Sequence, residues 1–228
     1  MSINFTTIHF TKIKGAQMSQ DKLTKLLENV EQMLRRNGRC NEWDSNVPVI
    51  SKGHHHTVYL TEEFSDPSSY NQMCHLLMNA NEVDEFTLVI NSLGGMLDSA
   101  FMVADAITRS QACVSAYVVG TVASAATIVA LACDKLEASE NLAFMIHNYS
   151  SGIQGKGHEM KARQTFIDNE LNKSFERYYL GFLSKEEITD VIEGKDIWLN
   201  SQEVMQRWEI KQKILCTLNR PHKLNKNQ

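Results

Sequence analysis

The fold is decided by the stretch CVSAYVVGTVASAATIVALAC, residues 113–133, which joins two apolar segments of different character. Residues 113–119 are short, β-branched and apolar, which predicts a buried strand. Residues 125–133 are rich in alanine and long enough for a buried helix. Gly120 is expected to supply the turn between them. A strand that leads directly into a buried helix is typical of α/β proteins.

Ser124 is placed by this pattern at the first turn of the helix. There a hydroxyl lies near unpaired backbone N–H groups and the positive end of the helix dipole. Those conditions suit a serine nucleophile and an oxyanion. The same position is favoured for a serine that only caps the helix. Ser124 taken alone therefore leaves both interpretations open.

The rest of the chain repeats the alternation of strand and helix. A parallel sheet covered by helices follows, with sites at the carboxyl ends of its strands. Gly94-Gly95, Ser124 and His147 each come just after a predicted strand. The predicted strands are 57–60, 86–91, 113–119, 136–138 and 143–146. The predicted helices are one that opens at Asp66-Pro67, then 98–109, 125–133, a long one over 158–181, 185–193 and 201–207.

The two ends of the chain carry weaker signals. An amphipathic helix is predicted over residues 21–36 and a polar loop over 37–56. The run His54-His55-His56 lies in that loop. It could bind a metal, but contiguous spacing suits one strand face poorly, so a polar loop is the default. Residues 211–228 are basic and polar and are expected to fray.

Composition excludes several classes of protein. The chain has 228 residues, 43% hydrophobic and 22% charged, as in ordinary globular domains. A net charge of −4 argues against a nucleic-acid binder driven by bulk charge. Five scattered cysteines and the lack of a signal peptide predict a reducing, cytoplasmic location. The uncharged run 110–133 is broken by glycine, serine and threonine, so no membrane span is expected.

Four motifs in one order resemble those of the Clp protease proteolytic subunit family, ClpP, over residues 57–207. That family has Asn-Ser-Pro-Gly-Gly, Gly-x-Ala-Ala-Ser, Met-Ile-His-Gln-Pro and Arg-Asp-x-Phe-x-Ser-x-x-Glu-Ala. The matching segments here are 91–95, 120–124, 145–149 and 195–204. The resemblance implies a ClpP/crotonase-like α/β fold, mainly parallel sheet covered by helices. It also implies a serine endopeptidase with Ser124 as nucleophile, His147 as general base and Asp196 as the residue that orients the base.

The resemblance assigns further roles by position. Gly95 and Ala125 match the oxyanion-hole donors, and the long helix 158–181 matches the helix by which two rings pack. A heptameric or double heptameric ring is implied, with polypeptide substrates and with neither cofactor nor metal. Segments 95–97 and 149–153 match strands that hold an extended peptide through its main chain. The implied substrate-binding residues are Gly94, Met96, Leu97, Tyr149, Ser150, Ser151, Gly152 and Ile153.

Departures from the family pattern leave alternatives. Leu93 and Tyr149 stand where prolines are usual, and residues 1–56 do not match the axial loop of the family. The expected organisation is a divergent segment 1–56, a protease domain 57–210 and a basic tail 211–228. Docking of an ATP-driven unfoldase is therefore not implied. A ClpP-like viral head-maturation protease, a non-catalytic ring subunit and a crotonase-like acyl-CoA enzyme are the competing hypotheses.

Overall fold

A computed structural model describes residues 47–150, 152 and 154–218 of the chain. The amphipathic helix predicted over residues 21–36 lies outside the described residues, as do the last ten positions. No helix in the described part is long and apolar enough to cross a membrane.

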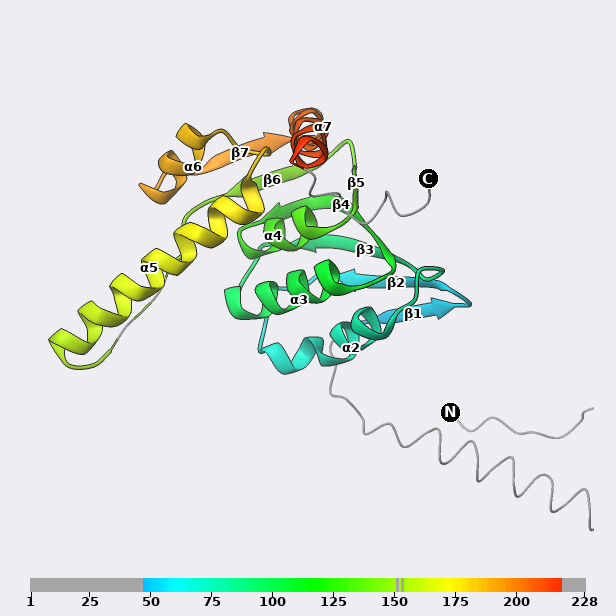
Figure 1. The fold of residues 1–228 in the computed structure, drawn as a ribbon, viewed down its shortest axis with the longest axis horizontal. Coiled ribbons are helices and arrows are strands. Elements are labelled where there is room, and N and C mark those ends of the chain that lie inside the picture. Colours follow the sequence, from blue (N-terminus) through cyan, green and yellow to red (C-terminus); the bar gives the residue numbers. More distant parts are fainter. Residues whose placement is uncertain (1–46, 151, 153, 219–228) are drawn as a thin grey trace, which may run out of the picture. The chain divides into compact units, whose positions relative to one another are not determined.

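Seven strands of the described residues form one sheet (Figure 1). Its order is β1-β2-β3-β4-β6-β7, and β5 also pairs with β4. β2, β3, β4, β5 and β6 run parallel to their neighbours, whereas β1 and β7 pair antiparallel at the two edges. The predicted mainly parallel α/β fold is confirmed. The strands are β1 Val49–Lys52, β2 His55–Leu60, β3 Glu85–Ser92, β4 Cys113–Ala123, β5 Lys135–Ala138, β6 Ala143–Ile146 and β7 Ile197–Asn200.

Helices α2, α3 and α4 lie side by side on one face of the sheet (Figure 1). α5 has 23 residues, and its buried side chains all lie in its second half, so the first half extends away from the sheet. α7 packs against β5, β6 and β7. The helices are the 3-10 helix η1 Pro67–Tyr70, α2 Asn71–Asn79, α3 Leu97–Arg109, α4 Ala125–Ala132, α5 Gly157–Tyr179, α6 Lys185–Ile192 and α7 Ser201–Thr217.

The core forms between the sheet and these helices. Along β3, buried and exposed side chains alternate, because successive residues of a strand point to opposite faces. All eight residues of α4 are buried. Alanine suits this helix because its small side chain lets α4 lie close to both the sheet and α3. The Thr127 hydroxyl of α4 is 2.6 Å from the Tyr179 hydroxyl of α5, which ties the projecting helix to the core.

A bulge in β4 decides where this strand ends. The pairing of β3 with β4 shifts between Ile90 and Ser92, which leaves extra residues on β4 around Gly120. Gly120 has a φ of 66° and lies against the Asn91 side chain, whose Oδ1 accepts the Thr121 N–H at 3.1 Å. Before the bulge β4 pairs with β5, and after it with β6. The predicted turn at Gly120 is therefore wrong: the strand continues to Ala123, and the turn falls at Ser124.

Two other predictions at the ends of the domain are wrong. Residues 49–52 and 55–60 form the antiparallel pair β1 and β2, so the predicted loop over 37–56 contains strand. α7 continues to Thr217, beyond the predicted end at 207. Lys211, expected in a fraying tail, is only 3% exposed and donates from Nζ to the Tyr178 carbonyl at 2.5 Å. Its long aliphatic stem lets a basic residue pack in an apolar helix face.

The histidine run opens β2, and its members have separate partners. His54 Nδ1 lies 2.7 Å from Asp84 Oδ1. His56 Nδ1 lies 2.8 Å from the Ser51 hydroxyl, and its ring stacks on Phe86. Among the described residues, no group of three or more His, Cys, Asp or Glu side chains could hold a metal ion. His56 thus joins β2 to β1 and β3, and His54 joins the turn before β2 to the residue before β3.

Candidate active site

Ser124 forms a sharp turn between β4 and α4. Its φ is 55° and its ψ is −129°, and no other non-glycine residue in the described part of the chain has a positive φ. Such a backbone conformation is strained, and strain of this kind is common at functional sites. Ser124 occupies the N-cap position of α4, but its side chain makes no capping hydrogen bond. The structure therefore does not support the interpretation of Ser124 as a helix cap.

Two glycines hold the neighbouring loop against this turn. A Cβ on Gly94 would lie 2.6 Å from the Ser124 Cβ and 2.8 Å from the Ala123 carbonyl oxygen. A Cβ on Gly95 would lie 2.4 Å from the Phe64 carbonyl oxygen. Phe64 donates to the Gly94 carbonyl at 2.6 Å, and Met96 donates to the Phe64 carbonyl at 2.8 Å. Only glycine permits such close approach on both sides of the loop.

Two backbone N–H groups near Ser124 have no acceptor among the described residues. The Gly95 N–H lies between the two hydrogen bonds that the loop makes with Phe64 and takes part in neither. The Ala125 N–H is in the first turn of α4, where no carbonyl of the preceding turn exists. Both residues line the same cavity as Ser124. They are therefore available to an oxygen atom bound there.

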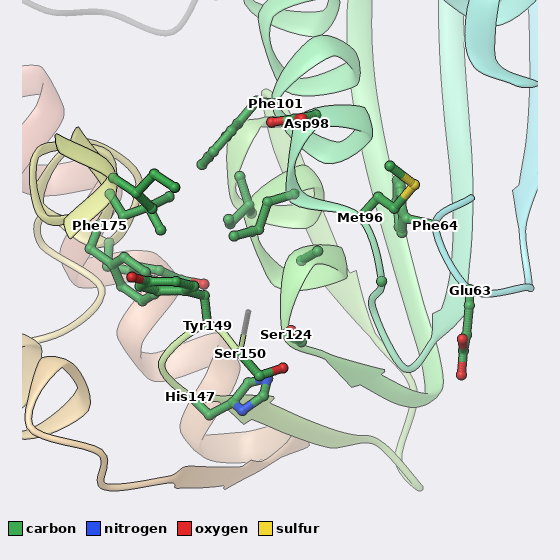
Figure 2. A pocket seen from close by; sticks show the side chains of 17 residues that line it. Glu63, Phe64, Met96, Asp98, Phe101, Ser124, His147, Tyr149, Ser150 and Phe175 are labelled. Carbon is green, nitrogen blue, oxygen red and sulfur yellow. The ribbon is translucent and has the colours of Figure 1, made fainter. Parts of the chain in front are cut away.

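The sheet register brings His147 next to Ser124. Ala123 pairs with Met145, and the Ser124 N–H donates to the Met145 carbonyl at 2.9 Å. His147 is the first residue after β6, and its side chain lines the same cavity as Ser124 (Figure 2). The bulge in β4 is thus what aligns the end of this strand with the end of β6.

Asp196 reaches the same region from β7. Ile146 pairs with Ile197 in the antiparallel ladder of β6 and β7. His147 follows this pair and Asp196 precedes it, so the two residues continue the same register. Asp196 is exposed and does not line the cavity. Among the described residues, no hydrogen bond links Ser124, His147 and Asp196. The register places Asp196 next to His147 in the ladder but leaves it outside the cavity that Ser124 and His147 line.

A cavity of about 710 Å³ opens beside Ser124 (Figure 2). Most of its wall is apolar, and the second half of α5 supplies one side of it. The sequence did not single out this wall as part of a site, although the apolar positions of the long helix were visible. The lining residues are Glu63, Phe64, Gly95, Met96, Leu97, Asp98, Phe101, Ser124, Ala125, Ile128, His147, Tyr149, Ser150, Ile167, Leu171, Phe175 and Tyr179.

The expected substrate-binding segments are only partly in place. Met96, Leu97, Tyr149 and Ser150 line the cavity, and Gly94 lies behind it against Ser124. Neither segment is a strand in the described residues, since Gly95 makes a single bridge to Phe64 and residues 147–150 have no strand partner. Segment 95–97 does not form a strand because α3 begins at Leu97. Gly152 is exposed, and Ser151 and Ile153 lie outside the described residues.

Tyr149 makes a contact with α5 that was not predicted from the sequence. Its hydroxyl donates to Asp168 Oδ1 and accepts from Gln164 Nε2, two side chains of α5. Burial, followed by the hydrogen bond to Asp168, raises the pKa of Tyr149. The only sequence signal for this contact was the helical spacing of Gln164 and Asp168, which places both polar side chains on one helix face.

Comparison with known proteins identifies the family of the chain. The family model described as Clp protease matches residues 47–208. The ATP-dependent Clp protease proteolytic subunit 2 of Pseudomonas aeruginosa is 30% identical over 139 residues, which cover 59% of this chain and 68% of that protein. A ClpP1 mutant from Listeria monocytogenes has a similar fold, with a TM-score of 0.55 and 23% identity over 68% of this chain and 88% of that one. The chain belongs to the Clp protease family.

Proposed function

We propose that the protein is a serine endopeptidase of the ClpP type, which hydrolyses peptide bonds through Ser124, His147 and Asp196. The observation that carries the proposal is the strained turn at Ser124. Its hydroxyl, freed from helix capping, lies in one cavity with the His147 ring and two unpaired N–H groups. Membership of the Clp protease family supports the same chemistry.

In the proposed reaction the Ser124 Oγ attacks the peptide carbonyl carbon, and His147 accepts the hydroxyl proton. The N–H groups of Gly95 and Ala125 donate to the oxyanion of the tetrahedral intermediate, a contribution of about 3 kcal/mol for one such donor. The C–N bond then breaks as His147 returns the proton to the leaving amine. Water hydrolyses the acyl-enzyme by the same route, and Asp196 stabilises the imidazolium.

The substrate is proposed to be an extended polypeptide that passes Gly94, Met96 and Leu97 on one side and Tyr149, Ser150, Ser151, Gly152 and Ile153 on the other. Main-chain binding of this kind selects weakly among side chains. We also propose that the chains assemble into a heptameric or double heptameric ring and need neither cofactor nor metal. A cytoplasmic location, without nucleic-acid or membrane partners, remains a prediction from the sequence.

The test is a peptidase assay on the full chain with a fluorogenic peptide library. Ser124→Ala should lower kcat by about 10³-fold or more while the native mass of the assembly is unchanged. Ser174→Ala, which changes a partly buried serine of α5 that does not line the cavity, is the matched control and should keep wild-type activity. A fluorophosphonate should label wild type at Ser124. Labelling at another residue, with Ser124→Ala still active, would refute the proposal.

The exposure of Asp196 supports one competing candidate, a non-catalytic ring subunit. Without a hydrogen bond between Asp196 and His147, Asp196 does not fix the tautomer of the imidazole or stabilise its cation in the single chain. In an active enzyme, substrate binding or assembly has to bring Asp196 within hydrogen-bond distance of His147. An assembled wild-type sample that neither cleaves peptides nor reacts with the fluorophosphonate would favour this second candidate.

A further inference from the structure

The segment that carries His147 leaves the sheet before it reaches α5. β6 ends at Ile146, and residues 147–150 pair with no strand. The sheet therefore fixes the start of the segment but not the direction in which the His147 ring points. Contacts made after His147 must supply that restraint.

Two side chains make such contacts, each with a different helix. Asn148 Nδ2 donates to the Ile192 carbonyl at the end of α6 at 2.8 Å. The Asn148 Oδ1 also accepts the Tyr149 N–H at 2.8 Å. The Tyr149 hydroxyl bonds to the α5 side chains of Gln164 and Asp168. One anchor is therefore on α6 and the other on α5.

The α5 anchor is a closed group of three polar side chains. Gln164 Nε2 is 2.5 Å from the Tyr149 hydroxyl oxygen and 2.8 Å from Asp168 Oδ1. The Tyr149 hydroxyl donates to that same carboxylate oxygen. Hydrogen bonds to a charged carboxylate are stronger than bonds between neutral groups. The hydroxyl end of the Tyr149 ring is thus hydrogen-bonded to Asp168, which is itself hydrogen-bonded to Gln164.

We propose that this group, Tyr149 with Gln164 and Asp168, positions the segment 147–149 and so orients the His147 imidazole toward Ser124. The inference rests on the proposed function, in which His147 is the general base. Tyr149 is a positioning residue that acts through the backbone two residues from His147. Proline is the usual residue at this point of the family motif and restricts the backbone covalently, whereas here a side-chain tether supplies the restraint.

Tyr149→Phe removes only the hydroxyl and tests the tether directly. Since small displacements of a catalytic group are costly, kcat should fall about tenfold, with KM within about twofold of wild type. The rate of fluorophosphonate labelling at Ser124 should fall in parallel, because it depends on His147 but not on peptide binding. Asp168→Ala should have the same effect, and the double variant should be no worse than either single variant.

The matched control is Tyr117→Phe, which removes a hydroxyl from an exposed tyrosine of β4 that does not line the cavity. It should leave kcat and labelling unchanged. A change in KM alone for Tyr149→Phe would show that the hydroxyl acts in peptide binding and not in positioning His147, and would overturn the proposal. Wild-type kinetics in Tyr149→Phe, or additive effects in the double variant, would also overturn it while the proposed function stands.

Hydrogen exchange measured by mass spectrometry keeps the tether testable without activity. In Tyr149→Phe the amides of residues 147–150 should exchange about tenfold faster than in wild type, while those of β3 stay protected. Unchanged exchange in this segment would refute the tether. If wild type neither cleaves peptides nor reacts with the probe, the proposed function fails, and the exchange result still decides whether Tyr149 holds the segment.

Discussion

Gly94→Ala tests the close approach between the glycine loop and the Ser124 turn. The new Cβ would meet three atoms at 3.0 Å or less, namely the Ser124 Cβ, the Ala123 carbonyl oxygen and the Ala125 nitrogen. None of these is the end of a flexible side chain, so backbone has to move. The φ of 101° at Gly94 adds strain of about 1–3 kcal/mol for any residue with a Cβ. Overpacking adds a further ~1–3 kcal/mol.

Gly194→Ala is the control that separates these two contributions. Gly194 has a φ of 102°, and a Cβ there would meet nothing within 4 Å. Gly194→Ala should therefore show the backbone strain alone. The free energy of unfolding, taken from urea titrations followed by circular dichroism, should be about 1–3 kcal/mol lower for Gly94→Ala than for Gly194→Ala.

Activity provides the second readout for the same variant. The moved backbone belongs to Ser124 and Ala125, so fluorophosphonate labelling of Gly94→Ala should be lost even at temperatures where it is fully folded. Gly53→Ala, in the open turn between β1 and β2, should label like wild type. Equal unfolding free energies for Gly94→Ala and Gly194→Ala, or normal labelling of Gly94→Ala, would contradict the steric reasoning.

Two further predictions concern buried and partly buried charges of α7. Burial lowers the pKa of Lys211 from its ordinary value of 10.5 to about 8. Between pH 8 and 10.5 this lysine is protonated in the unfolded chain but not in the folded one, so the free energy of unfolding should rise with pH over that range. Lys211→Met should be more stable than wild type at pH 7, with a difference that shrinks over that range in urea titrations. Hydrogen bonds from Arg207 at 2.7 and 2.8 Å hold the pKa of Glu187 below its ordinary value, so their stabilisation should be present above pH 4.5 and lost as the pH falls through the lowered pKa. Arg207→Lys should lower the free energy of unfolding by about 1–2 kcal/mol at pH 7 and make the loss of stability at acid pH smaller. If the loss of stability at acid pH is unchanged, the pairing of Arg207 with Glu187 is contradicted.

Local patterns predicted most of the elements because each depends on residues close in sequence. The strand predicted over 86–91, the Ala-rich helix predicted over 125–133 and the helix start predicted at Asp66-Pro67 are all confirmed, as β3, α4 and η1. The helix predicted over 185–193 is present as α6 and begins with a capping box, in which the Glu187 N–H donates to the Ser184 hydroxyl at 3.1 Å. Errors arose where a distant contact changed the local preference. Gly120 is an example, since its left-handed conformation supports a bulge against Asn91 instead of a turn.

The sequence by itself determined the kinds of side chain at the candidate site and the strand ends they follow, because motif order and hydrophobic period are local properties. Ser124 and His147 were singled out in that way, and Asp196 was added by the resemblance to the ClpP motifs. The tertiary structure decided how they meet. Pairing between strands sets the register that brings Ser124 beside His147 and leaves Asp196 exposed. Packing of α5 across the cavity adds its apolar wall and the Tyr149 tether, and such contacts join residues whose spacing in the sequence carries no signal.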